Sequence, residues 1–255
     1  MKRIYTLLLL IILSFYTFSC ASSSSGEKRK NFELQSNGPV AKNITPIKVF
    51  FNENKKGSNN LALKNKKTKV KEAKREKLVE YALKFNGHIR VKKNKKFRND
   101  CSGFVRSVYD NFDIELYNTS KVKKGKKWLN GTEIIYNFVK DNGKVFKKGK
   151  PNVGDIIFFD NTTDRNRDGR VNDKFTHIAI IVKVNKNGTI HYIHKSNRGI
   201  NIQKLNLRHS NKAYIKHGKK KIKVNSYLRK RRKNDKRNTP YLSSQLFRSF
   251  GSLFK

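Results

Sequence analysis

The stretch that decides the fold reads "THIAIIVKVNKNGTIHYIHKSNRGINIQKLNL" and occupies residues 176–207. Its apolar residues fall into short runs rich in isoleucine and valine, which is typical of β-strands. Asn187 and Gly188 separate two of these runs and favour a tight hairpin turn, so the chain should return antiparallel to itself. We therefore predict an antiparallel sheet of about five strands. The sequence marks strands at residues 154–160, 176–185, 188–196 and 199–207.

Upstream of this sheet, apolar residues recur at the spacing of a helix. Helices followed by an antiparallel sheet define an α+β domain, to which we assign residues 71–210. The helices are expected from Lys71 to a stop at Asn86-Gly87, from Ser102 to Phe112, and from Thr132, as N-cap, to Asp141.

The residues after this domain, 211–255, form a basic tail. Thr239 and Pro240 have the preferences of a helix start. The apolar residues that follow share one helical face, so we predict an amphipathic C-terminal helix, packed on the domain or lying on a membrane surface. These residues are Leu242, Leu246, Phe247, Phe250, Leu253 and Phe254.

The first 20 residues have the pattern of an export signal. Lys2 and Arg3 precede an apolar run at 4–18, and Cys20 follows where a bacterial lipoprotein carries its lipidated cysteine. An ordinary signal peptide or an uncleaved anchor is the alternative. We expect an exported protein of the cell envelope, held to the membrane through Cys20. Residues 21–70, rich in Lys, Asn and Ser, are expected to be a linker with a short docking strand at 44–51.

The formal net charge of +42 should draw the chain to anionic partners. Lysine is abundant in every region, which favours a general compositional bias over one selected patch. An anionic envelope polymer is therefore a candidate partner, whereas export argues against nucleic acid as the physiological one.

Cys101 is the thiol that remains if Cys20 carries lipid. It opens a predicted helix, where unpaired backbone N–H groups and the helix dipole should lower its pKa and favour the nucleophilic thiolate. A nucleophilic cysteine needs a base. His177 opens one strand, and the returning strand offers either His191 or His194 beside it, because the sequence leaves the pairing register open.

Four segments in this order, "DCSGFVRSVY", "GDIIFFD", "THIAIIV" and "IHKSNRGI", resemble the NlpC family of papain-like cell-wall cysteine peptidases. The resemblance implies a papain-like fold, no required cofactor, and cleavage of amide bonds in peptidoglycan stem peptides. It also implies that Cys101 is the nucleophile, His177 the base and His194 the residue that orients the base. The chain lacks the tyrosine and paired glycines that the family carries before the cysteine motif. The alternatives are an amidase or acyltransferase of the same superfamily, and a non-catalytic envelope protein that binds anionic polymer.

The loop "DRNRDGRVND" between two predicted strands has the D-x-N-x-D-G spacing of a calcium loop. Phe175 stands where such a loop has its bidentate glutamate, so Asp173 or Asp160 would have to replace it. The alternative is a turn rich in Asp and Asn. The predicted ligands of a structural calcium are Asp164, Asn166, Asp168, Arg170 and Asn172.

Overall fold

The computed structural model describes residues 55–91, 96–125, 127–233 and 235–254, which belong to one compact unit, Glu53–Lys255. The predicted signal peptide with Cys20, the docking strand and most of the linker lie outside the described residues. No helix in the described part of the chain is long and apolar enough to cross a membrane.

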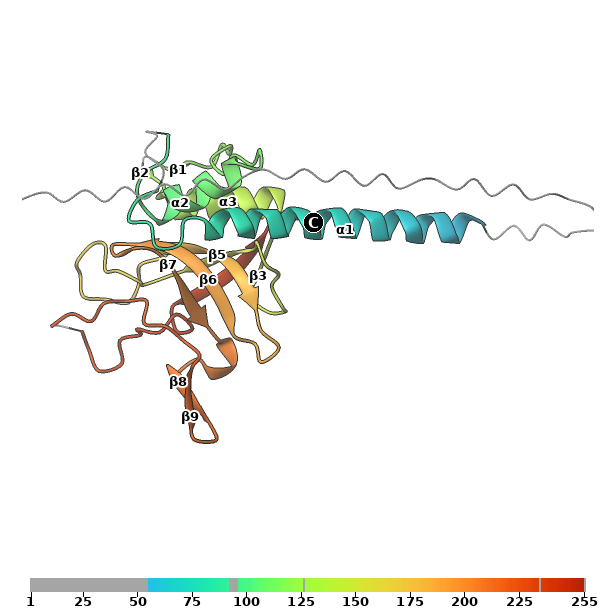
Figure 1. Ribbon diagram of the computed structural model, residues 1–255. Coiled ribbons are helices and arrows are strands. Elements are labelled where there is room, and N and C mark those ends of the chain that lie inside the picture. Colours follow the sequence, from blue (N-terminus) through green and yellow to red (C-terminus); the bar gives the residue numbers. More distant parts are fainter. Residues whose placement is uncertain (1–54, 92–95, 126, 234, 255) are drawn as a thin grey trace, which may run out of the picture. The chain divides into compact units, whose positions relative to one another are not determined.

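A six-stranded antiparallel sheet forms the centre of this unit, in the order β3-β10-β4-β5-β6-β7 (Figure 1). The prediction of an α+β fold with an antiparallel sheet is confirmed, with six strands in place of about five. The sheet strands are β3 (Lys144–Phe146), β4 (Ile156–Phe159), β5 (His177–Val184), β6 (Ile190–Ser196), β7 (Gly199–Leu205) and β10 (Phe247–Ser252). Two small hairpins pair β1 (Lys123–Lys124) with β2 (Lys127–Trp128) and β8 (Tyr214–His217) with β9 (Lys220–Lys223), and a short 3-10 helix spans Leu207–His209.

The two faces of the sheet bury different side chains, as the two-residue period of a strand requires. In β4, Ile156 and Phe158 pack toward the helices, whereas Ile157 and Phe159 pack into the opposite layer. The chain after β9 contributes Leu246 to this opposite layer. Because both faces are covered, β4 is apolar along its whole length.

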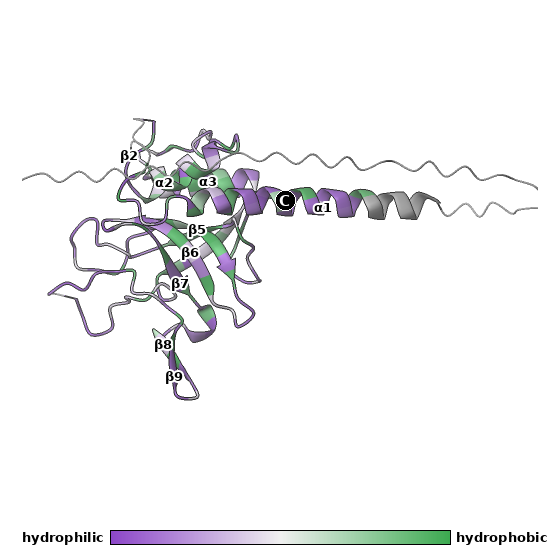
Figure 2. Cartoon of the chain, viewed as in Figure 1, coloured by the Kyte–Doolittle hydropathy of each residue, from purple (hydrophilic) through white to green (hydrophobic). Residues whose placement is uncertain are grey.

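Three helices pack on one face of the sheet (Figure 1). The first begins before the predicted Lys71, so residues 55–70 are helical and not linker, in a segment rich in good helix formers. Residues 63–74 are exposed, and Figure 2 shows hydrophilic colouring along much of this helix. Only its C-terminal part enters the core, through residues such as Leu78. The helices are α1 (Lys55–Leu83), α2 (Cys101–Asp110) and α3 (Gly131–Asn142).

The predicted C-terminal helix is wrong. Phe247–Ser252 form β10, which lies in the sheet between β3 and β4. Phe250 pairs with Phe146 on one side and Ile157 on the other. A central strand buries apolar side chains on both faces, so its apolar residues can have the spacing of an amphipathic helix. Tertiary contacts then decide whether the segment is a strand or a helix. Residues 211–255 are therefore not a separate tail.

Candidate active site

The start of α2 is fixed by the residues around Cys101. Asp100 is the N-cap, and its carboxylate accepts hydrogen bonds from the Gly103 N–H and the Ser102 hydroxyl, both at 2.8 Å. At Gly103, a Cβ atom would collide with the backbone carbonyl of Arg98, so the close packing there requires glycine. The Asp-Cys-Ser-Gly motif thus places Cys101 as the first residue of the helix.

His177 opens β5 after a strained turn. Phe175, two residues earlier, adopts φ of +53°, a left-handed conformation that is costly for an aromatic residue. Asp160 accepts a hydrogen bond from the Phe175 N–H (2.8 Å) and forms an ion pair with Arg248 (2.7 Å). The Arg248 guanidinium stacks over the Phe175 ring at 3.9 Å. A residue of β10 thereby holds the turn that aims His177.

The structure places His194 beside His177. The Nε2 of His177 lies 2.7 Å from the Nδ1 of His194. His191, the alternative, pairs with Lys183 near the other end of β5 and contacts Asn185. Because His194 occupies the Nε2 of His177, the Nδ1 of His177 is the nitrogen left to exchange a proton with a thiol.

Cys101, His177 and His194 line one cavity of about 350 Å³. Cys101 is partly exposed and belongs to the layer between α2 and the sheet, so the thiol reaches the cavity from the helix side. The two histidines reach it from the strands. The other lining residues are Asn99, Asp100, Thr162, Thr163, Thr176, Lys195, Ser196, Asn197 and Leu228.

The expected low pKa of Cys101 is wrong. Burial of the thiol, and then the negative charge of Asp100, raise its pKa to about 11. Hydrogen bonds from the Thr132 side chain and from the backbone N–H groups of Ile178 and Ser102 act in the opposite direction and are outweighed. The residue that caps the helix is thus also the residue that disfavours the thiolate.

Thr132 is a site residue that the sequence did not reveal. It was expected to be the N-cap of α3, but the side chain of Asn130 has that role and accepts a hydrogen bond from the Glu133 N–H (3.1 Å). Thr132 is buried and directs its hydroxyl to Cys101. Only the packing of α3 against α2 brings these two residues together.

The pKa values of both histidines are lowered, which favours their neutral forms. Burial, and then the neighbouring His194, lower the pKa of His177 well below its ordinary value. Burial lowers the pKa of His194 to about 4, with the Asn201 side chain acting in the opposite direction. Near pH 7 the site therefore holds a neutral thiol beside two neutral imidazoles.

The loop that carries the predicted calcium ligands connects β4 to β5. Asp168 accepts hydrogen bonds from the Arg170 N–H (2.8 Å) and from the side-chain amides of Asn166 (2.9 Å) and Asn172 (3.1 Å). These contacts are those of a turn rich in Asp and Asn.

Asp164, the first predicted calcium ligand, is buried and lies 3.4 Å from the Arg232 guanidinium. It also accepts a hydrogen bond from the Gly169 N–H (3.1 Å). Within the described ranges, no group of three or more His, Cys, Asp or Glu residues is arranged to hold a metal ion. The Arg232 guanidinium beside Asp164 opposes a cation at this position, and the side chains of Asn166 and Asn172 hydrogen-bond to Asp168. The predicted calcium loop is untested, and the neighbouring guanidinium leads us to expect weak or no binding.

The model of the NlpC/P60 family matches residues 84–219, which is more than half of the chain. The search of curated proteins and the search of solved structures found no match. The chain belongs to the NlpC/P60 family, and its fold is the papain-like one. This membership supports a general cell-wall peptidase or amidase function.

Proposed function

We propose that this NlpC/P60 protein is a cysteine peptidase that hydrolyses amide bonds in peptidoglycan stem peptides. The observation that carries the proposal is the convergence of Cys101, His177 and His194 on one cavity, with the Nε2 of His177 lying 2.7 Å from the Nδ1 of His194. A nucleophile, a base and a group that orients the base are what acyl transfer through a thiol requires.

The reaction begins from the neutral thiol. The sulfur of Cys101 attacks the scissile carbonyl carbon while its proton passes to the Nδ1 of His177. In this proposal the proton between the two rings is assigned to the Nε2 of His177, which donates to the Nδ1 of His194 2.7 Å away; the Nδ1 of His177 is then free to accept. The backbone N–H of Cys101, at the start of α2, is the group assigned to stabilise the developing oxyanion, since the Gly103 N–H already donates to Asp100.

The protonated His177 then gives its proton to the leaving amine as the C–N bond breaks, which leaves a thioester on Cys101. Water attacks the thioester and transfers a proton to His177. Release of the carboxylic acid returns the thiol and the neutral imidazole. The neutral thiol of Cys101 and the neutral imidazole of His177 suit this order of steps, because the proton moves from sulfur to nitrogen during the attack and not before it.

Purified peptidoglycan digested by the wild-type chain and by Cys101→Ala tests the proposal. The expected result is new stem-peptide fragments in the mass spectrum with the wild type and none above background with the variant. Equal digestion by both would refute the cysteine mechanism. If neither cleaves but both bind peptidoglycan, the non-catalytic alternative replaces the proposal. Transfer of the acyl group to an added amine in place of water would identify the acyltransferase alternative.

We also propose that the domain is held to the membrane of the cell envelope by lipid on Cys20. The support is the export pattern before Cys20 in the sequence. Expression with radiolabelled fatty acid, followed by detergent phase separation, should give a labelled, detergent-phase protein. Cys20→Ala should be unlabelled and aqueous, and labelling of that variant would reject the proposal.

A further inference from the structure

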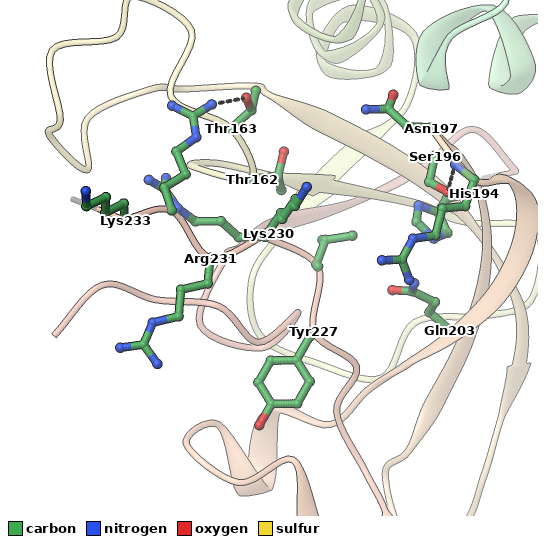
Figure 3. A pocket seen from close by; sticks show the side chains of 14 residues that line it. Thr162, Thr163, His194, Ser196, Asn197, Gln203, Tyr227, Lys230, Arg231 and Lys233 are labelled. Carbon is green, nitrogen blue, oxygen red and sulfur yellow. Dashed lines mark hydrogen bonds between the residues drawn. The ribbon is translucent and has the colours of Figure 1, made fainter. Parts of the chain in front are cut away.

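A second and larger cavity, of about 770 Å³, continues from the catalytic one. One side is formed by the β6–β7 hairpin and the other by residues 227–233 (Figure 3). Figure 3 shows His194 and Gln203 across this cavity from Lys230 and Arg231. The residues shared by the two cavities are Thr162, Thr163, His194, Ser196, Asn197 and Leu228. A ligand in one cavity can therefore extend into the other.

The charge of this lining has one sign. Six of its residues are lysine or arginine and none is aspartate or glutamate. Four of the six are exposed and form no ion pair with any residue that the structure describes. We call these four residues, with the cavity that they line, the cationic groove. They are Arg198, Lys230, Arg231 and Lys233.

The other two cations fix the segment in place. Arg229 is buried, pairs with partly buried Asp235 at 3.0 Å and donates to the Asn161 carbonyl at 2.9 Å. Arg232 contacts Asp164 in the loop before β5. The contacts of buried Arg229 and exposed Arg232 thus hold the segment 227–233 to the body of the domain, while its other cations are exposed and unpaired within the described residues. This arrangement distinguishes the groove from the evenly basic surface that the composition predicts.

We propose that the cationic groove is a substrate subsite for an acidic peptide, which carries its carboxylates on one side of the scissile amide. Free guanidinium and ammonium groups pair with carboxylates, and the neighbouring Asn197 and Gln203 amides suit the peptide backbone. A peptide is favoured over a separate polyanion because the groove shares its lining with the cavity that takes the amide. The inference rests on the proposed function, since it adds a subsite for the carboxylates of the peptide to the proposed peptidase site.

Hydrolysis of paired peptides tests the subsite. Stem peptides from purified peptidoglycan are compared with the same peptides amidated at their carboxylates, either on the acyl side or on the amine side of the scissile bond. We expect amidation on one side to lower kcat/KM by about tenfold, since several exposed ion pairs are lost, and amidation on the other side to have little effect. The preference should shrink as salt is added. The inference would be overturned if the two amidations lowered kcat/KM equally, or if neither lowered it.

Two charge-matched variants locate the effect. In Arg198→Gln/Lys230→Gln/Arg231→Gln/Lys233→Gln, the ratio of kcat/KM between the free and amidated peptides should fall to about one. Lys216→Gln/Lys219→Gln/Lys220→Gln/Lys221→Gln removes the same charge from the exposed β8–β9 hairpin and should keep the wild-type ratio. Equal loss in both variants would show a general effect of net charge and would overturn the subsite. Melting temperatures of both variants check that they fold.

Binding to Cys101→Ala separates this inference from the proposed function. By calorimetry, the variant should bind the free peptide more tightly than the amidated one, whether or not the wild type cleaves it. If the wild type cleaves through Cys101 but the variant shows no such preference, the function stands and the subsite fails. If inorganic polyphosphate binds the groove while amidation has no effect, the groove serves a separate polyanion and the acidic-peptide subsite is rejected.

Discussion

The catalytic cavity and the cationic groove adjoin, but the ionisable groups in them differ in charge. In the cavity these groups are neutral, because burial raises the pKa of Cys101 and lowers those of His177 and His194. The groove exposes charge, with four cations that pair with no described residue. A neutral thiol and imidazole can exchange a proton directly during the reaction, whereas recognition of an anion needs charges that are already present. The proposed function therefore assigns the bond-breaking chemistry and the recognition of the substrate to two adjoining cavities.

Removal of the base should have the largest effect on the catalytic side of this comparison. His177→Ala should lower kcat by about 10³, within the range for loss of general acid–base catalysis. His194→Ala should cost less, about 10–100-fold, because it orients the base and does not take the proton itself. Steady-state hydrolysis of a stem peptide measures both. His191→Ala, at the other end of the strands, is the control and should match the wild type, and a large loss in that control would reassign the third residue.

The neutral state of the cavity predicts the reactivity of its thiol. With a pKa of about 11, the thiolate fraction of Cys101 should rise tenfold with each pH unit, and iodoacetamide should alkylate it about 100-fold faster at pH 9 than at pH 7. Mass spectrometry of the peptide that contains Cys101 follows the rate. A rate that is flat between pH 6 and pH 8 would show a preformed thiolate–imidazolium pair and break the contrast with the groove.

The buried histidines should make the stability of the fold depend on pH. The pKa of His194 is about 4 in the folded chain against about 6.5 in the unfolded one, so the unfolded state binds more protons in between. Stability is therefore present above pH 6.5 and lost as the pH falls, by about 2 kcal/mol from His194 between pH 6.5 and pH 5. His177 adds in the same direction. Urea unfolding at the two pH values measures the loss, and His194→Gln should reduce it; an unchanged loss would place its origin elsewhere.

Calcium is expected to have the smallest effect. The Arg232 guanidinium already faces Asp164, so excess calcium should leave the melting temperature unchanged. Calorimetry should show no binding heat. A clear rise in melting temperature that Asp168→Asn abolishes would restore the predicted calcium loop and would loosen the segment that forms one wall of the groove.

The parts of the fold that the sequence predicts are those with a local cause. The strand runs around His177 and His194 and the motif at Cys101 each specify their own geometry within a few residues. The sequence predicts a helix where the structure has β10, because contacts with β3 and β4 decide the conformation of that segment.

The candidate site divides in the same way. The order of the motifs identifies Cys101, His177 and His194 as candidates. The sequence predicts a lowered pKa for Cys101, and the structure gives a raised one, since burial depends on the packing of α3 and the sheet. The cationic groove was also hidden in the sequence. Its two sides come from distant segments, and its basic residues resemble those of every other region.

The position of β10 makes the domain vulnerable to shortening. All three candidate catalytic residues precede it, yet β10 joins β3 to β4 and supplies Arg248, which supports the turn before His177. A protease cut or premature stop before residue 247 would keep every reactive group and still leave two strand edges open to pair with other chains. Such fragments should aggregate and should not retain partial activity. The activity of the domain therefore requires that β10 is present, although β10 carries none of the candidate catalytic residues.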